Sequence, residues 1–301
     1  MSISGAIVPM ATPTVGRGGD VDEPALRRYT ETLVEGGVHG LFPCGSIGEF
    51  SSLSDDDRRT VVETTVEAAG DVPVLAGCGD TSVSAVEEHV ATAAEVGADV
   101  AVVVTPYYLS TTQEGLVRFY REIAEDAAVP IVLYNIPALT GQRLAVDTVV
   151  ELSSLGGVVG MKDTSGDLTY LRDVIHATPD GFSVLQGATE LAVASLDVGA
   201  DGIVAGPANV FPGALAELYD AYRRGDRDRA VELLDGVANP VVSATNDVPT
   251  AAGIKYLCSL SDVDVGAPLP PLPELTDDQR RRLRRCFEAV TGSAAVRPTE
   301  A

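Results

Sequence analysis

The stretch Gly160-Met161-Lys162-Asp163-Thr164 follows the apolar pair Val158-Val159 and precedes a helix-like segment that begins near Asp167. This order predicts a buried strand that carries a lysine at its carboxyl end. The lysine is unusual, because the chain has 21 basic residues and only Lys162 and Lys255 among them are lysines. A desolvated lysine, unlike arginine, can lose its proton, and the neutral amine can form a Schiff base with a carbonyl compound. The alternative is an ordinary strand-end lysine with a buried stem and a solvated head.

On both sides of this strand, short apolar runs alternate with amphipathic helical runs. Eight runs are expected as strands, at residues 5–12, 40–43, 72–76, 99–104, 130–134, a run that ends at Lys162, 182–185 and 202–205. Eight strand–helix units are the number found in a TIM (β/α)8 barrel. The alternative α/β architecture is a doubly wound open sheet, which normally has fewer strands and often a glycine fingerprint near its start.

The chain is predicted to form one domain with two parts. Residues 1–224 are assigned to the (β/α)8 barrel, and residues 225–301 to a helical C-terminal extension of the same domain. Within the extension, helices are expected at about residues 226–237, 249–259 and 276–291. Asp22 and Ser54 are expected to cap the first two helices of the barrel.

The composition excludes several classes of partner. With 44 acidic and 21 basic residues, the formal net charge is −23, which repels nucleic-acid phosphates and anionic lipids. The acid excess, together with arginine in place of lysine, predicts a halophilic protein. In molar salt the Debye length falls to about 3 Å, so self-repulsion is screened.

Cysteine and histidine usage predicts neither a disulfide framework nor a metal site. The four cysteines form no CxxC pair, and the three histidines are not spaced as ligands. The N-terminus lacks the basic and apolar regions of a signal peptide, and no stretch reaches the roughly 18 apolar residues of a membrane span. We therefore expect reduced thiols and a cytoplasmic location.

The strand ends of a TIM barrel bring three polar side chains together. Because the carboxyl ends of the strands face the active site, Ser46, Tyr134 and Lys162 are expected to converge. Gly45 and Gly48 let the loop after the second strand approach a ligand with its backbone N–H groups, and such a loop can hold a carboxylate. This set suits a 2-oxo acid whose ketone condenses with the lysine while the phenol moves a proton, without a metal ion.

Three motifs resemble the signatures of the dihydrodipicolinate synthase / N-acetylneuraminate lyase family. They are Gly45-Ser46-Ile47-Gly48-Glu49, Tyr134-Asn135-Ile136-Pro137 with Thr140-Gly141, and Gly160-Met161-Lys162-Asp163-Thr164-Ser165-Gly166-Asp167. The resemblance covers nearly the whole chain. It implies a metal-independent class I pyruvate aldolase, a lyase on a TIM barrel, commonly a homotetramer. Its only cofactor equivalent is the covalent Schiff base.

The resemblance also implies roles for individual residues. Lys162 matches the Schiff-base lysine and Tyr134 the proton shuttle. Ser46, with the neighbouring N–H groups of the loop from Gly45 to Ile47, matches the group that holds the substrate carboxylate. Tyr108 matches a tyrosine that reaches into the site of a neighbouring subunit.

Departures from the family pattern bear on the substrate. Ile47 stands where the family often has a second hydroxyl residue that relays protons. Dihydrodipicolinate synthases have an arginine just after the Tyr134–Pro137 motif, which binds the carboxylate of aspartate semialdehyde, whereas this chain has Ala138-Leu139-Thr140. Arg143, a few residues on, is not expected to substitute. Sialic acid lyases are matched only in part, because Gly206 replaces their serine after the eighth strand.

The first choice of reaction is therefore cleavage of a 2-keto-3-deoxy sugar acid to pyruvate and an aldehyde. The halophilic composition and a similarity to archaeal 2-keto-3-deoxygluconate aldolases favour 2-keto-3-deoxygluconate, or its 6-phosphate. Its hydroxyls would meet Thr164, Gly187 and Thr189.

Other activities stay open. They are 4-hydroxy-tetrahydrodipicolinate synthase activity, N-acetylneuraminate lyase-like activity, dehydration of a keto-deoxy sugar acid, and binding of a 2-oxo acid without turnover. Glu49 is expected to pair with a loop group, and Lys255 to be structural.

Overall fold

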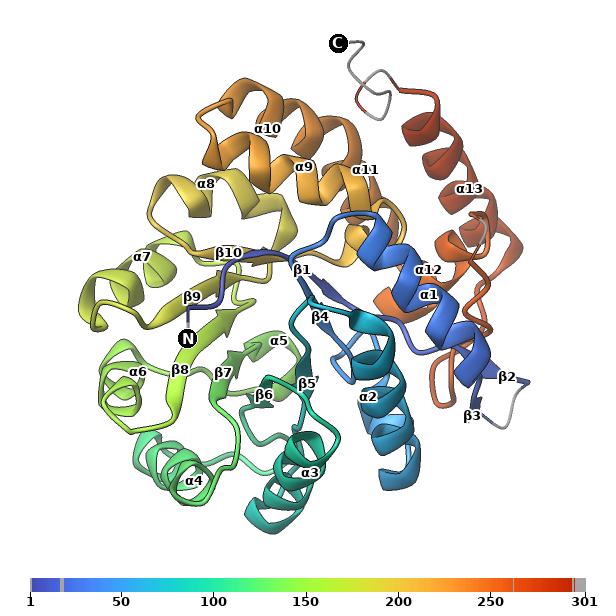
Figure 1. Cartoon of the computed structure of the whole chain (residues 1–301). Coiled ribbons are helices and arrows are strands. Elements are labelled where there is room, and N and C mark those ends of the chain that lie inside the picture. The colour runs from blue at the N-terminus through green and yellow to red at the C-terminus, as the bar shows by residue number, and fades with distance from the viewer. Residues whose placement is uncertain (1, 17–18, 262, 294, 296–301) are drawn as a thin grey trace.

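The computed structural model describes residues 2–16, 19–261, 263–293 and 295 (Figure 1). Its centre is a sheet of eight parallel strands in the order β4-β1-β10-β9-β8-β7-β6-β5. The strands are β1 (Gly5–Pro9), β4 (Gly40–Phe42), β5 (Leu75–Gly77), β6 (Val100–Val104), β7 (Ile131–Asn135), β8 (Val158–Asp163), β9 (Ser183–Gln186) and β10 (Gly202–Val204). A bridge between Leu41 and Val74 joins the two ends of the sheet and closes it. The predicted TIM barrel is confirmed.

Helices surround the closed sheet, as Figure 1 shows. They are α1 (Glu23–Glu35), α2 (Asp55–Ala69), α3 (Val83–Glu95), α4 (Gln113–Glu125), α6 (Val146–Ser153), α7 (Leu168–Ala177), α8 (Ala192–Asp197) and α9 (Pro212–Arg223), with short turns η1 (Phe50–Ser52), α5 (Pro137–Thr140), η2 (Thr189–Leu191) and η3 (Gly206–Asn209). Side-chain caps fix several starts: Asp22 accepts from Ala25 N, and Ser54 forms a capping box with Asp57. Both predicted caps are confirmed.

The strands are buried on both faces. In β6, Val100, Val102 and Val104 belong to the cluster inside the barrel, whereas Ala101 and Val103 belong to the layer between strands and helices. This arrangement explains the continuous apolar runs of the sequence, since a strand with two buried faces needs no polar alternation.

Two segments differ from the expected secondary structure. The first strand ends at Pro9 rather than at residue 12, because Ala11 N donates to Asn209 Oδ1 and Thr12 Oγ1 donates to Gly48 O instead of to a strand neighbour. The turn that follows contains a short antiparallel hairpin, β2 (Thr14–Val15) with β3 (Asp20–Val21).

The helical extension contains α10 (Arg227–Leu233), a π turn η4 (Leu234–Ala238), α11 (Asn239–Thr245), α12 (Thr250–Cys258) and α13 (Asp277–Thr291). Helix α11 was not predicted. Pro240 lies at its start, and because proline has no N–H to donate to the preceding turn, the chain passes through the wider η4 turn there. Helices α12 and α13 pack on each other at the edge of the barrel (Figure 1).

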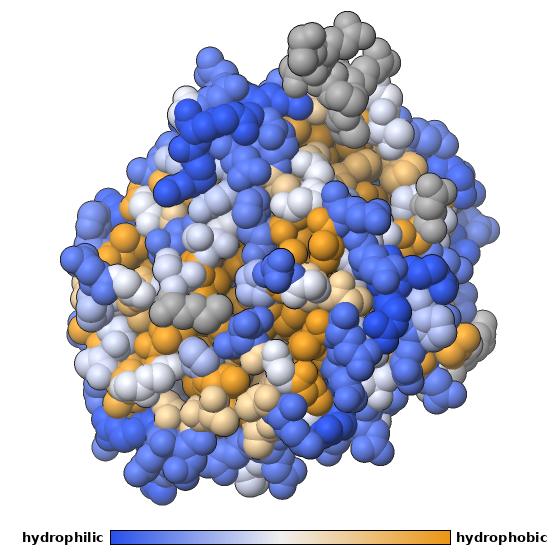
Figure 2. Space-filling model, viewed as in Figure 1, coloured by the Kyte–Doolittle hydropathy of each residue, from blue (hydrophilic) through white to orange (hydrophobic). Residues whose placement is uncertain are grey.

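The surface carries arginine as its basic residue, because both lysines are buried: Lys162 is 6% exposed and Lys255 is 1% exposed. On the face drawn in Figure 2, hydrophilic residues dominate the rim and hydrophobic residues show through towards the middle. No helix in the described part of the chain is long and apolar enough to span a membrane.

Candidate active site

Lys162 and Tyr134 lie side by side at the carboxyl ends of β8 and β7. The register of the two strands pairs them directly. The Lys162 Nζ atom lies 3.9 Å from the centre of the Tyr134 ring, and the Tyr134 side chain, 4% exposed, belongs to the cluster inside the barrel. Within the described residues, Nζ makes no hydrogen bond and no ion pair. The strand ends therefore present an amine and a phenol to the same space, and the amine has no competing protein partner.

Phe42, the last residue of β4, completes the wall around the amine. Its ring centre is 4.9 Å from Lys162 Nζ and 6.3 Å from the Tyr134 ring, which it meets edge to face. Two aromatic rings therefore border the amine, and Lys162 is almost completely shielded from water. Sequence reasoning missed Phe42, because an aromatic residue in an apolar strand gives no local sign that its ring will lie beside the lysine.

The loop from Gly45 to Gly48 lies after β4 and is packed tightly. An added Cβ on Gly48 would lie 2.9 Å from Met10 O, so only glycine fits there. The backbone N–H groups of Ser46 and Ile47 have no acceptor in the described part of the chain. Backbone N–H groups without a protein acceptor can bind a carboxylate. The Ile47 side chain reaches towards Gly206, where an added Cβ would lie 3.0 Å from Ile47 Cδ1.

Thr164 and Gly187 border Lys162 on the other side. An added Cβ on Gly187 would lie 2.1 Å from Thr164 Oγ1 and 2.9 Å from Lys162 Cε, so the three residues meet at one point. Thr164 Oγ1 is buried and has no hydrogen-bond partner among the described residues. A buried hydroxyl without a partner is costly unless a ligand supplies one. This geometry favours Thr164 as a ligand contact.

Asp163 supports the lysine strand from its outer face. Its carboxylate accepts from Asn135 Nδ2 at 2.7 Å and from Ser165 Oγ at 2.7 Å. Burial raises the pKa of Asp163, and the hydrogen bonds from Asn135 and Ser165 oppose that rise. Asn135 follows Tyr134 in β7, and Asp163 follows Lys162 in β8. The Asn135–Asp163 hydrogen bond therefore helps to hold the two strands in the register that pairs Tyr134 with Lys162.

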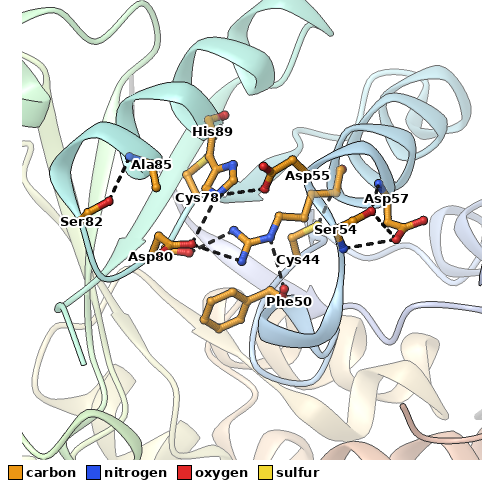
Figure 3. Close-up of polar contacts among 12 residues, drawn as sticks. Cys44, Phe50, Ser54, Asp55, Asp57, Cys78, Asp80, Ser82, Ala85 and His89 are labelled. Carbon is orange, nitrogen blue, oxygen red and sulfur yellow. Dashed lines mark hydrogen bonds and ion pairs between the residues drawn. The ribbon is translucent and has the colours of Figure 1, made fainter. Parts of the chain in front are cut away.

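A cluster of charged side chains around Arg58 contacts the loop after β4 at Phe50. Arg58 donates to Phe50 O at 3.2 Å and to Gly79 O at 3.1 Å. His89 Nε2 lies 3.6 Å from Asp80 and 3.8 Å from Asp55, and Figure 3 shows it between these two carboxylates. Desolvation and the nearby Arg58 lower the pKa of His89, although both carboxylates oppose the shift.

A cavity of about 310 Å³ opens beside the loop after β4, and neither Lys162 nor Tyr134 is among its lining residues. Ser46, Val104, Ile136, Leu139, Thr140 and Leu272 are among the residues that line it, and none of its lining residues is basic. Leu139 is exposed, in the segment where a synthase would carry its arginine. Arg143 instead pairs with Asp167 at 3.0 Å, and its guanidinium lies 4.1 Å from the centre of the Tyr170 ring.

Two further residues, Thr189 and Tyr108, were predicted to contact the substrate and a neighbouring subunit. Thr189 begins η2 and is buried, two residues after Gly187. Tyr108 follows β6, is 92% exposed and has a left-handed φ of 76°. Their roles stay predictions.

Comparison with known proteins decides the family. Residues 2–290 match the model of the dihydrodipicolinate synthetase family. The chain belongs to that family. The matched range includes all three motifs named above and every strand of the barrel, and the predicted family resemblance is confirmed.

Named relatives of the dihydrodipicolinate synthetase family span nearly the full length of the chain. The 4-hydroxy-tetrahydrodipicolinate synthase of Syntrophus aciditrophicus is 38% identical, covering 94% of this chain and 97% of the relative. A protein named as an uncharacterized DapA-like lyase, from Halobacterium salinarum, is 36% identical, covering 92% and 91%. The chloride-inhibited dihydrodipicolinate synthase of Acinetobacter baumannii, solved with pyruvate, has a TM-score of 0.89 and 32% identity, covering 96% and 99%.

These matches support an enzyme of the lyase type, because members of the dihydrodipicolinate synthetase family are Schiff-base, pyruvate-dependent aldolases. They do not carry over a substrate. The described residues contain no group of three or more His, Cys, Asp or Glu side chains arranged to hold a metal ion.

Proposed function

We propose that this protein is a class I aldolase that binds pyruvate, or the pyruvate half of a larger 2-oxo acid, as a Schiff base on Lys162. The observation that carries the proposal is the buried amine of Lys162, which has no protein partner and lies against the Tyr134 ring at 3.9 Å. An amine held in this way is free to attack a ketone carbon, with loss of water, to give an iminium ion.

The surrounding groups fit the remaining steps. The N–H groups of Ser46 and Ile47 would hold the carboxylate of the 2-oxo acid, and the Tyr134 hydroxyl would move the proton to and from the departing or attacking oxygen. The iminium ion accepts the electron pair of the C–C bond that breaks, so the reaction needs no metal ion. Addition of EDTA is therefore expected to leave the activity unchanged.

Two different overall reactions are supported by different observations. The names of the relatives favour 4-hydroxy-tetrahydrodipicolinate synthase activity, in which pyruvate condenses with aspartate semialdehyde, over our first choice from the sequence. The site residues favour that first choice, cleavage of 2-keto-3-deoxygluconate, because no basic residue lines the cavity beside Ser46, where we propose that the far end of the substrate lies. Exposed Leu139 replaces the expected arginine, and Arg143 is already paired with Asp167.

Borohydride trapping tests the core of the proposal. The protein is incubated in molar KCl with pyruvate, with 2-keto-3-deoxygluconate, or with neither, then reduced and analysed by peptide-resolved mass spectrometry. A pyruvate-sized adduct on Lys162 from both compounds supports a Schiff-base aldolase that cleaves the sugar acid. Because Lys255 is the other lysine of the chain, it serves as an internal control. Absence of an adduct with pyruvate would refute the proposal and leave the non-catalytic binder.

Steady-state kinetics then decide between the cleavage and the condensation reactions. The specificity constant for cleavage of 2-keto-3-deoxygluconate is compared with that for condensation of pyruvate with aspartate semialdehyde. A preference for condensation would establish the synthase reaction, as the relatives suggest. A preference for cleavage predicts that Leu139→Arg raises the condensation activity, because it supplies the missing cation, whereas Leu139→Met does not. A dehydrated sugar-acid adduct would instead indicate a dehydratase.

The assembly proposed is a homotetramer, as the family resemblance implies, with Tyr108 reaching into a neighbouring site. Light scattering measures the assembly. Tyr108→Ala is expected to lower activity only if two subunits share a site.

A further inference from the structure

A buried ion pair lies directly behind the loop that is proposed to hold the carboxylate. The Lys255 Nζ atom, from α12, is 2.6 Å from Glu49 Oε2, and both side chains are 1% exposed. Leu269 N donates to the other oxygen, Glu49 Oε1, at 2.6 Å. Glu49 is thus fixed by two groups of the C-terminal extension, far from it in the sequence.

Lys255 is held in turn by the segments around it. It donates to Ala267 O at 2.9 Å and to Thr14 Oγ1 at 3.4 Å. Burial lowers the pKa of Lys255, and the charge of Glu49 opposes that shift. The contacts of this ammonium group are therefore with the protein itself, and they join the extension, the segment after β1 and the loop after β4.

The energetics of such a pair suggest a role beyond stability. A buried ion pair is often no more stabilising than apolar residues of the same volume, because desolvation offsets the attraction. Glu49 also has a left-handed φ of 55°, which is uncommon for a residue other than glycine. Strained backbone persists where the surrounding structure over-determines it, and such residues gather at functional sites.

The position of Glu49 in the chain shows what the pair can control. Glu49 directly follows Gly48, and its N–H donates to Ser46 O at 3.2 Å. Thr12 Oγ1 donates to Gly48 O at 2.8 Å. The backbone of Ser46 and Ile47 therefore lies between β4 and Glu49, the residue that the ion pair holds in place.

We infer that the Glu49–Lys255 ion pair is a positioning device, which aims the backbone N–H groups of Ser46 and Ile47 at the carboxylate of the substrate. The helical extension is then a working part of the carboxylate site, and Glu49 and Lys255 are positioning residues. This inference rests on the proposed function, because it presupposes a Schiff base with a 2-oxo acid on Lys162.

The test compares pyruvate with pyruvamide, which has the same ketone but an uncharged amide in place of the carboxylate. Rates of borohydride trapping on Lys162 are measured for both in the wild-type protein and in Lys255→Met. The wild-type protein is expected to prefer pyruvate. In the variant this preference falls about tenfold or more, since a misplacement of about 1 Å can cost about 100-fold in rate. The pyruvate concentration for half-maximal trapping rises more than the maximal rate falls.

A matched control separates positioning from general damage to α12. Leu257→Ala removes a fully buried side chain from the same helix but leaves the ion pair intact. It is expected to lower the melting temperature while keeping the wild-type preference for pyruvate. All rates are taken at a temperature where circular dichroism shows each variant folded.

A second variant keeps the inference falsifiable if Lys255→Met does not fold. The double variant Glu49→Gln with Lys255→Met removes both charges, so no buried charge is left unpaired. It is expected to fold and to show the same loss of preference. A wild-type preference for pyruvate in a folded Lys255→Met protein or in the double variant would overturn the inference. A wild-type protein that forms no adduct with pyruvate would instead show that the proposed function itself is wrong.

Discussion

Replacing Gly187 with alanine tests whether the space beside Lys162 is needed for the chemistry. An added Cβ would lie 2.1 Å from Thr164 Oγ1, 2.9 Å from Lys162 Cε and 3.1 Å from Asp163 O. Gly187 does not have a left-handed φ, so alanine introduces a clash but no backbone strain. The effect of Gly187→Ala is therefore an effect of crowding at the lysine.

The size of the effect follows from these distances. Ordinary van der Waals contact begins at 3.4 Å, so Thr164 Oγ1 must move by about 1.3 Å and Lys162 Cε by about 0.5 Å. The hydroxyl can rotate away, but the lysine is confined by the rings of Phe42 and Tyr134. Overpacking of this kind costs about 1–3 kcal/mol of stability. Because a misplacement of about 1 Å can cost about 100-fold in rate, we expect the imine to form about 10-fold to 100-fold more slowly.

The assay is the rate of borohydride-trapped pyruvate adduct on Lys162, with the melting temperature measured alongside. Gly156→Ala is the matched control, because an added Cβ there meets nothing within 4 Å and φ is not left-handed. The control is expected to trap pyruvate at the wild-type rate. A Gly187→Ala protein that is folded and traps pyruvate within about twofold of wild type would refute this reasoning, because crowding at Lys162 Cε would then have no effect on the step.

Three further predictions concern the lysine, a histidine and salt. Lys162→Met should abolish the adduct while leaving the melting temperature equal or higher, because a buried amine without a partner destabilises the fold; a clearly lower melting temperature would contradict this. The pKa of His89 is lowered from its ordinary 6.5, so the folded state resists protonation, and stability present above pH 6.5 should be lost as the pH falls through the folded pKa. Denaturant titrations from pH 7 to pH 5 should show a smaller loss in His89→Gln, and an unchanged slope would argue against the shift. Finally, the net charge of −23 predicts a higher melting temperature in molar KCl than in dilute buffer, and equal values in both would count against salt adaptation.

Much of the barrel could be predicted because its signals are local. Strands such as Val100–Val104 are continuous apolar runs, and helices begin at residues such as Ser54 whose side chains cap the next turn. Helix α11 and the β2–β3 hairpin were missed because both are short, with 7 residues in α11 and 2 in each strand of the hairpin. Among the site residues, Lys162 and Tyr134 were recognised because each ends a strand in a distinctive motif.

Other parts of the site had no local signal. Glu49 and Lys255 were expected to be a loop contact and a structural lysine, but nothing in the sequence indicated that they pair with each other. The same holds for Phe42, whose ring lies beside the amine only because β4 and β8 face one another across a closed barrel. Contacts between distant segments depend on closure and register, which the sequence pattern does not state.

The sequence by itself determined the barrel class, the family, the strand ends that carry the candidate catalytic groups, and a strongly acidic surface. These follow from periodicity, capping and charge, which are properties of neighbouring residues and of composition. Only the tertiary structure decided that Tyr134 and Lys162 are in register, that Thr164 and Gly187 meet at the lysine, and that Lys255 supports the loop after β4. Those facts depend on which strands pair, how the sheet closes and where the C-terminal helices pack, because only these arrangements bring residues far apart in the sequence into contact.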